Sequence, residues 1–245
     1  MRECLEEIRL PKAVLAGEMI RQADAKATLG GLITAHRRES PAGSVLILEG
    51  EETSSIFLVL SGWLLATKSL ADGQRQIIDI ILPGGILEPA CADRGRSAVE
   101  IQTLTDVTLA AIPRKRWRGA CDRHPDIDEM THRVIGAAMS RMSARMIRLG
   151  KAPAETVIAF ALCELCLRST ARALADGTQF HIPMTQQQLG DFCGLSAVHV
   201  CRTLRRLARN DVLSVKDHMN IVIHDMDAMA RIAEIDVEAL RAEII

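Results

Sequence analysis

One stretch, residues 182–210, constrains the fold more than any other part of the chain. It reads IPMTQQQLGDFCGLSAVHVCRTLRRLARN. Thr185 is a good N-cap residue, and Gln188 three positions later completes the pattern of a capping box. Gly194 supplies the backbone freedom that a sharp turn requires. The stretch therefore predicts two short helices joined by a tight turn, the second of them over about residues 196–210.

The second predicted helix has an apolar face and a polar face. Val200, Leu204 and Leu207 recur at helical spacing on the buried side. The other side combines short side chains with arginines, in a chain whose formal net charge is only −1. Such a helix fits the DNA major groove, where arginine binds guanine and phosphates. We favour a DNA-binding helix-turn-helix over a helical hairpin with a solvated basic face. The residues expected to contact DNA are Thr185, Gln187, Ser196, Ala197, Val198, His199, Cys201, Arg202 and Arg205.

Two short β-branched runs follow this helix. VLSVK and IVIHD are separated by the polar residues DHMN, which predicts a β-hairpin. Helix, turn, helix and hairpin together predict a winged helix-turn-helix domain over residues 151–245. We expect one more amphipathic helix from Met226 to Leu240 at its end.

The pattern is different between Pro41 and Pro113. Short runs rich in Val, Ile, Leu and Thr are separated by Gly, Asp or Pro, which predicts an antiparallel barrel or sandwich. We assign it, with a preceding helical segment broken at Gly30-Gly31, to a domain over residues 1–123. No histidine lies between His36 and His124, so a metalloenzyme barrel is disfavoured. We therefore expect no metal site, no catalytic residues and no enzymatic activity.

Helical spacing returns over residues 124–150. Small alanines and adaptable methionines on this helix would allow close pairing with another helix. We expect the same helix of a second copy to be the partner, because a two-fold homodimer matches palindromic DNA. The alternative is that the apolar stripe packs on the β domain. The residues expected at the dimer interface are Met130, Val134, Ala138, Met142 and Met146.

Composition places the chain in a reducing compartment away from membranes. The N-terminal residues MRECLEEIRL lack the apolar core of a signal peptide, and the longest apolar stretch is too short to span a bilayer. Seven cysteines, an odd number with uneven spacing, fit reduced thiols. Cys163 and Cys166 have a CxxC spacing, but they fall in an apolar helix where core packing is the better interpretation. We expect a cytoplasmic protein without a membrane partner.

These blocks together resemble the Crp/Fnr family of bacterial transcription regulators over about residues 36–223. The resemblance rests on Gly43, Gly50-Glu51 and Gly62 of the β region, on the long helix after Pro125, and on MTQQQLGDFCGLSAVHVCRTLRRL. It implies an α+β fold: a cyclic-nucleotide-binding, jelly-roll-like β-barrel sensor domain, a dimerisation helix, and a winged helix-turn-helix. It also implies a homodimer that binds double-stranded promoter DNA and acts on RNA polymerase.

The resemblance also implies an effector site. In cyclic-nucleotide-binding members a glutamate holds the ribose and an arginine pairs with the cyclic phosphate, and Glu88, Arg96 and Ser97 match this pattern. Leu87 replaces a family glycine, however, and Pro89 removes an amide donor. Two roles for Arg96 are therefore left open by the sequence. It could bind an anionic effector, or it could form an ion pair with Glu88. A ligand-binding module that acts on a protein partner is the alternative function.

Iron–sulfur members of the family carry several cysteines near the N-terminus. This chain has only Cys4 there, and Cys91 and Cys121 are distant in sequence. We therefore expect no iron–sulfur cluster and no other resident cofactor, while a small-molecule effector is left unidentified.

The recognition helix departs from the family at Val198, where many members have a glutamate that accepts from cytosine. Valine can contact a thymine methyl group but accepts no hydrogen bond. The sequence therefore predicts an altered half-site in which Arg202 still reads a guanine. Cys201 falls on the same face, where its oxidation would weaken DNA binding; the alternative is a small side chain tolerated against DNA.

Overall fold

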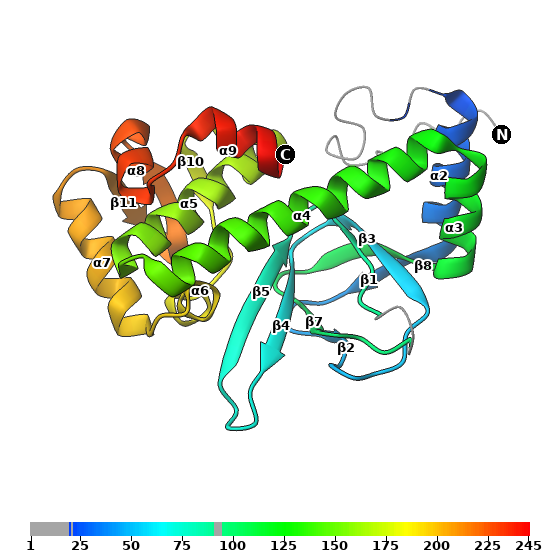
Figure 1. The fold of residues 1–245 in the computed structure, drawn as a ribbon, viewed down its shortest axis with the longest axis horizontal. Helices are drawn as coiled ribbons and strands as arrows, with labels where there is room; N and C mark the ends of the chain where they lie inside the picture. The colour runs from blue at the N-terminus through cyan, green and yellow to red at the C-terminus, as the bar shows by residue number, and fades with distance from the viewer. Residues whose placement is uncertain (1–19, 21, 91–94) are drawn as a thin grey trace. The chain divides into compact units, whose positions relative to one another are not determined.

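The computed structural model describes Ile20, residues 22–90 and residues 95–245. The chain forms two compact units, which Figure 1 shows as a ribbon. The first contains the described residues up to Thr67 together with Ile80–Gly136, and the second contains Lys68–Asp79 and Ala137–Ile245. The predicted long helix is present as α4 (Pro125–Lys151), and the division between the units falls within it.

The first unit contains most of two antiparallel four-stranded sheets, while residues 75–79 of β5 are assigned to the second unit. Their strand orders are β1-β8-β3-β6 and β2-β7-β4-β5, and one core that includes Ile47, Val59, Leu64 and Leu109 draws on both sheets. The predicted strands are confirmed, but the predicted barrel is not closed. Its edge strands are too short for a continuous ladder, since β6 has two residues and β2 three. The strands are β1 (Arg37–Ser40), β2 (Val45–Ile47), β3 (Ser55–Ser61), β4 (Leu64–Ser69), β5 (Arg75–Ile81), β6 (Ile86–Leu87), β7 (Glu100–Thr103) and β8 (Val107–Pro113).

Helices cover the outer face of the first sheet. Strands β3 and β8 are buried on both faces, which explains their nearly continuous apolar sequence. Their outward residues, such as Leu58 and Ile112, share a second core with Trp117 of α3 (Arg114–Arg123) and with α2 (Ala23–His36). This sheet is therefore the centre of a layered structure with a helical side and a sheet side.

Helix α2 continues through Gly30-Gly31, so the predicted break there is wrong. Each glycine costs a helix about 1 kcal/mol relative to alanine. Leu29 and Ile33 become fully buried on the same helix, and each such burial contributes about 1.5–3 kcal/mol. Tertiary packing therefore outweighs local propensity. The remainder of the predicted N-terminal helical segment, residues 1–19, lies outside the described residues.

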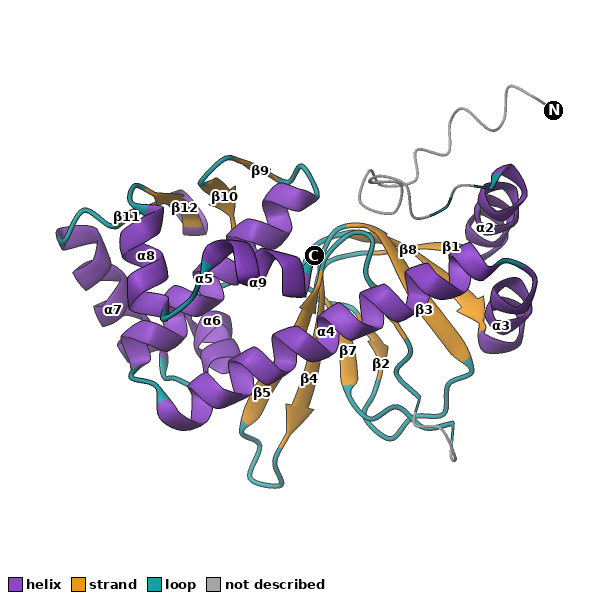
Figure 2. Cartoon of the chain, turned by 45° about the horizontal axis from the view of Figure 1, so that its top comes forward, coloured by secondary structure: helices purple, strands orange, loops and turns teal. Residues whose placement is uncertain are grey.

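A central helix organises the second unit. Helix α5 (Ala154–Ala171) is buried on every side from Thr156 to Ser169, as expected for a helix that is apolar all round. Figure 2 shows α6, α8 and α9 gathered near it, and α6, α7, α8 and α9 all contact it. No helix of the described ranges combines the length and the apolar character that crossing a bilayer requires. The surrounding elements are α6 (Gln186–Cys193), α7 (Ala197–Arg209), α8 (Met226–Ala233), α9 (Val237–Ile244) and a sheet of order β11-β12-β10-β9.

The predicted single terminal helix is two helices. Glu234 ends α8 in the left-handed conformation, with φ of +54°, and Asp236 starts α9 by accepting from the Ala239 amide at 2.8 Å. Arg148 of α4 donates to the carbonyls of Ala233 and Glu234 at 3.3 and 3.2 Å. The break is stable because these carbonyls at the end of α8 are satisfied by Arg148.

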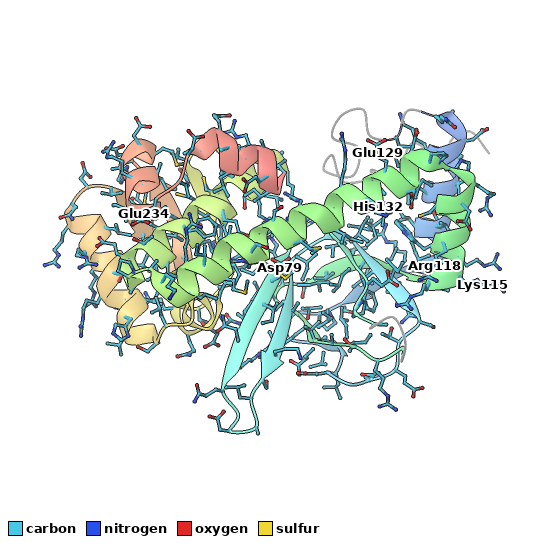
Figure 3. The ribbon with its side chains drawn as sticks, in the orientation of Figure 1. Asp79, Lys115, Arg118, Glu129, His132 and Glu234 are labelled. Atoms are coloured by element: carbon cyan, nitrogen blue, oxygen red, sulfur yellow. The ribbon has the colours of Figure 1, made fainter. Side chains whose placement is uncertain are left out.

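A buried charge cluster lies inside the second unit, and Figure 3 labels Asp79 beside α4. Asp79 accepts from Arg145 at 3.0 Å and from Arg141 at 3.2 Å, and Arg168 donates to Glu164 at 2.9 Å. Burial alone would raise the pKa of Asp79, but the nearby guanidinium groups outweigh it and lower that pKa to about 2. The cluster therefore holds Asp79 ionised in the interior.

Candidate nucleic-acid interface

The turn between α6 and α7 has the local structure that the sequence predicts. The Thr185 side chain accepts from the Gln188 amide at 3.1 Å, and the Gln188 side chain accepts from the Thr185 amide at 2.9 Å. Gly194 ends α6 with φ of +64°, a left-handed conformation that glycine adopts without strain. Ser196 caps α7 by accepting from the His199 amide at 3.4 Å. The capping box, the turn glycine and the second N-cap are all confirmed.

Gly190 brings the two helices into close contact. A Cβ atom at this position would overlap the carbonyl oxygen of Leu195, whose amide donates to the Gly190 carbonyl at 2.9 Å. The predicted apolar face of α7 is buried at Val200, Leu204 and Leu207. The buried face fixes α7 against the unit, so the opposite face is turned to solvent.

The solvent-exposed face of α7 carries small apolar side chains between its arginines. Val198 is 64% exposed, and Arg202 and Arg205 are exposed beside it. Short side chains allow a backbone to approach base edges, and the arginines supply donors for guanine and phosphate. One shallow hollow is lined by Ala197, Val198, Cys201, Arg202, Arg205, Ala208 and Arg209.

The remaining predicted DNA contacts lie around this face. Thr185 and Gln187 are exposed at the start of α6, and Gln187 donates to Asp191 at 2.8 Å. The Ser196 hydroxyl lies 2.9 Å from Nδ1 of His199, which orients that ring. Neither Ser196 nor His199 lines the hollow of α7. These residues are therefore placed at the edges of the recognition surface.

Two features of this surface were missing from the predicted site. Arg209 lines the same hollow as Arg202. It follows Arg202 by seven residues, about two helical turns, so the sequence could have placed both on one face. Arg206 instead forms an ion pair with Glu155 of α5, with Nη2 and Oε2 2.6 Å apart. No sequence pattern signals that pair, because 51 positions separate its members.

The predicted wing is present. Strand β11 (Leu213–Lys216) pairs with β12 (Asn220–Ile223), and a short 3₁₀ turn, Asp217–Met219, joins them. Strand β12 also pairs with β10 (Gln179–His181), which in turn pairs with β9 (Ala175–Asp176). The wing is thus the edge of a small sheet rather than an isolated hairpin.

The predicted effector residues of the first unit have other partners. Glu88 pairs with Arg114 at 2.5 Å, whereas the exposed Arg96 pairs with Glu52 at 3.1 Å. The alternative prediction, an ion pair between Glu88 and Arg96, is therefore wrong. The Ser97 hydroxyl donates to the Val99 carbonyl at 2.5 Å. Each of the three side chains thus has a partner elsewhere in the described part of the chain, and an effector at Arg96 stays a prediction.

The expected dimer stripe on α4 needs correction. Met130 is buried in the core that contains Trp117, and Val134 packs partly against the same core. The first turns of α4 are thus covered by this chain's own helices and sheet, so Met130 is unavailable to a partner. Ala138 is partly buried, whereas Met142 and Met146 are exposed. Met139 and Leu149 are also exposed on the second half of the helix.

The CxxC cysteines pack in the interior, as predicted. Burial raises the pKa of Cys163 to about 12 and that of Cys166 to about 11. Thiolates are the reactive form of cysteine, so these thiols are poorly suited to redox catalysis at neutral pH. Across the described ranges, no group of three or more His, Cys, Asp or Glu side chains could hold a metal ion. Of the cysteines considered for an iron–sulfur cluster, Cys4 and Cys91 lie outside the described residues.

Two family models match the chain. The cyclic nucleotide-binding domain matches residues 37–124, and the Crp-like helix-turn-helix domain matches residues 158–232. The first covers the two sheets and α3, and the second covers most of α5, the helix-turn-helix and the wing. These matches agree with the resemblance drawn from the sequence.

Known proteins are similar over most of the chain. The nitrogen fixation regulation protein FixK of Azorhizobium caulinodans is 24% identical over 223 residues, 91% of this chain and 87% of that protein. The transcriptional activator protein FnrA of Stutzerimonas stutzeri is 29% identical over 175 residues, 71% of each. The structure of FixK2 from Bradyrhizobium japonicum has a TM-score of 0.68 at 21% identity and covers 80% of this chain and 96% of that one.

Proposed function

Because the chain belongs to the Crp/Fnr family of transcription regulators, we propose that it binds palindromic promoter DNA as a homodimer. Helix α7 would enter the major groove, and the wing would lie along the backbone. The observation that carries this proposal is the exposed face of α7, with small side chains between Arg202, Arg205 and Arg209. We infer that the protein acts in the cytoplasm and that RNA polymerase is its partner at the promoter.

The base preference follows from the chemistry of this face. Arg202 would bind the O6 and N7 atoms of a guanine. Val198 and Ala197 offer methyl groups to thymine but no acceptor to cytosine. Helix α7 has no acidic residue among Ala197–Arg209. It therefore offers no carboxylate to accept a hydrogen bond from the N4 amino group of cytosine. We therefore propose a half-site read through guanine and thymine.

A second copy of the chain would pair along α4. Met139, Met142, Met146 and Leu149 follow one another at steps of three, four and three residues, and their exposed fractions are 61%, 37%, 70% and 44%. Alternating steps of three and four residues are the spacing of a coiled-coil seam. Four exposed apolar side chains in one row would otherwise remain in water. This row keeps Met142 and Met146 of the predicted stripe and leaves out Met130, Val134 and Ala138.

The first unit would carry the regulatory signal. The match to a cyclic nucleotide-binding domain supports this role. An anionic effector at Arg96 would have to displace Glu52, whose ion pair is exposed and therefore weak. Glu88 would have to leave Arg114 to take part. A ligand different from a cyclic nucleotide therefore fits this unit better.

Selection of bound duplexes from a random DNA pool, with purified protein and no added effector, tests the function. We expect a two-fold symmetric site whose half-sites lie about one helical turn apart. If the pool is not enriched, the selection is repeated with cyclic nucleotides and under reducing conditions. Failure under all of these conditions would contradict DNA binding and would favour a regulatory module that acts on a protein partner.

A further inference from the structure

Arg206 is a member of the arginine cluster of α7 whose charge is already engaged within the protein. Its guanidinium Nη2 lies 2.6 Å from Glu155 Oε2 in the first turn of α5. Half of the Arg206 side chain and about a quarter of the Glu155 side chain are exposed, at 50% and 27%. Among the described residues, no carboxylate pairs with Arg202, Arg205 or Arg209. Arg206 therefore differs from its neighbours on the same helix.

The position of this pair puts Glu155 at the border of the DNA-binding face. Arg206 follows Arg202 by four residues, so both lie along the same side of α7. A DNA phosphate near Arg202 would compete with Glu155 for the Arg206 guanidinium, because carboxylate and phosphate bind arginine through the same donors. The negative charge of Glu155 would also repel that phosphate.

We propose that Glu155 sets the DNA affinity of the protein and its salt dependence by withholding Arg206 from DNA phosphates. The inference rests on the proposed DNA binding and deepens it. Phosphate contacts supply non-specific affinity, whereas base contacts supply discrimination. A recognition helix with four available arginines would bind any duplex more strongly. Holding one arginine back therefore lowers the affinity for every duplex by a similar factor and limits retention of the protein on unrelated sequence.

The variant Glu155→Gln tests this step. Glutamine keeps the size of the side chain and removes the charge that binds Arg206. We expect stronger binding to the selected site and to duplex DNA of unrelated sequence, by a similar factor in both. The plot of log affinity against log salt should become steeper by about 0.9, the slope contributed by one phosphate contact. A purely structural ion pair would leave this slope unchanged.

A double-mutant cycle identifies Arg206 as the residue released. Arg206→Ala should have little effect on DNA affinity in the wild-type background, but it should abolish the gain produced by Glu155→Gln. Arg209→Ala is the matched control, since its loss of affinity and slope should be equal in both backgrounds. The urea midpoint of each variant is measured alongside, to confirm that the folded state is retained.

The possible results separate the two proposals. If the wild-type protein binds its selected site and Glu155→Gln leaves the salt slope unchanged or lowers affinity, the role of Glu155 is overturned and the regulator stands. Equal losses from Arg206→Ala in both backgrounds would overturn it as well. If the wild-type protein binds no duplex at all, both proposals fail.

Discussion

Asp79 and Arg145 form an ion pair in the interior of the second unit, with Oδ1 3.0 Å from Nη2. Asp79 comes from strand β5 and Arg145 from helix α4, 66 positions apart in the sequence. Arg141 and Arg168 lie against the same carboxylate. A single acidic side chain is therefore in contact with guanidinium groups from two helices, and Glu164 is the second carboxylate of the cluster.

Asp79→Asn should destabilise the protein strongly. It leaves Arg141, Arg145 and Arg168 buried with Glu164 as the remaining carboxylate of the cluster. Breaking a buried ion pair from one side costs about 3–5 kcal/mol, because the other charge is left uncompensated. Urea unfolding measures the change. The control Glu52→Gln removes an exposed partner of Arg96 and should cost less than about 1 kcal/mol. Equal losses in the two variants would contradict the role of the cluster.

The contribution of Asp79 should vanish in acid. Its pKa is lowered from 3.8 to about 2 in the folded protein, so the folded state binds its proton less readily than the unfolded state. The resulting stability is present above pH 3.8 and is lost as the pH falls toward 2, a difference of about 2 kcal/mol. The difference in unfolding free energy between the wild type and Asp79→Asn, measured across this range, should narrow by about this amount. A constant difference would show that Asp79 does not titrate as described.

Gly190→Ala should disrupt the helix-turn-helix. The added methyl group would overlap the Leu195 carbonyl, and overpacking of this kind costs about 1–3 kcal/mol. We expect a lower unfolding midpoint together with loss of DNA binding in a mobility-shift experiment. Gly136→Ala is the matched control, since its methyl group meets nothing within 4 Å on α4. It should stabilise the protein by up to about 1 kcal/mol.

Arg202→Ala should change which DNA sequences are preferred. Loss of one bidentate contact to guanine costs about 1–3 kcal/mol on the selected site and relaxes the preference at one position. Arg209→Ala serves as comparison, because an arginine near the end of α7 is expected to bind phosphate and to weaken all duplexes alike. Competition binding against single-base variants of the site measures both. An unchanged preference at every position would rule out Arg202 as a base-reading residue.

Met146→Glu should separate the proposed dimer. Met146 is 70% exposed in the single chain, so a carboxylate there costs the monomer little, whereas in a seam it would be desolvated beside its own copy. Sedimentation velocity should show the wild type as a dimer and the variant shifted toward monomer. The control Leu174→Glu alters an exposed apolar residue outside α4 and should leave the dimer intact. A monomeric wild-type protein would contradict the pairing.

The helix-turn-helix could be predicted because its determinants are local. Thr185 and Gln188 are three residues apart, and Gly194 and Ser196 lie next to the elements that they end or begin. Each choice depends on chemistry within one turn of the chain. The strands were likewise readable from short runs between turn residues. Their closure was not, because the edges of a sheet depend on pairing between distant segments.

The parts that the sequence could not predict depend on distant contacts. Methionine and alanine occur on several sides of α4, so the burial of Met130 depends on Trp117 and α2 rather than on its own spacing. Asp79 interrupts the apolar run IIDII, which signals a buried partner but not its identity. That partner, Arg145, lies on another element. Glu88 and Arg96 matched a family pattern, yet ion pairs with the sequence-distant Arg114 and Glu52 decide their geometry.

Helix α4 carries Arg145 and Arg148 toward the interior and Met142 and Met146 toward solvent, at fixed angles around one axis. Each residue added to an α-helix turns everything after it by about 100°. A single alanine inserted after Ser143 would therefore turn Arg145, Arg148 and Met146 by this angle relative to Met142, although no side chain had been removed. Seven inserted residues would nearly restore the alignment. Chimeric regulators spliced within this helix should accordingly tolerate exchanges in whole heptads and fail at the lengths between them.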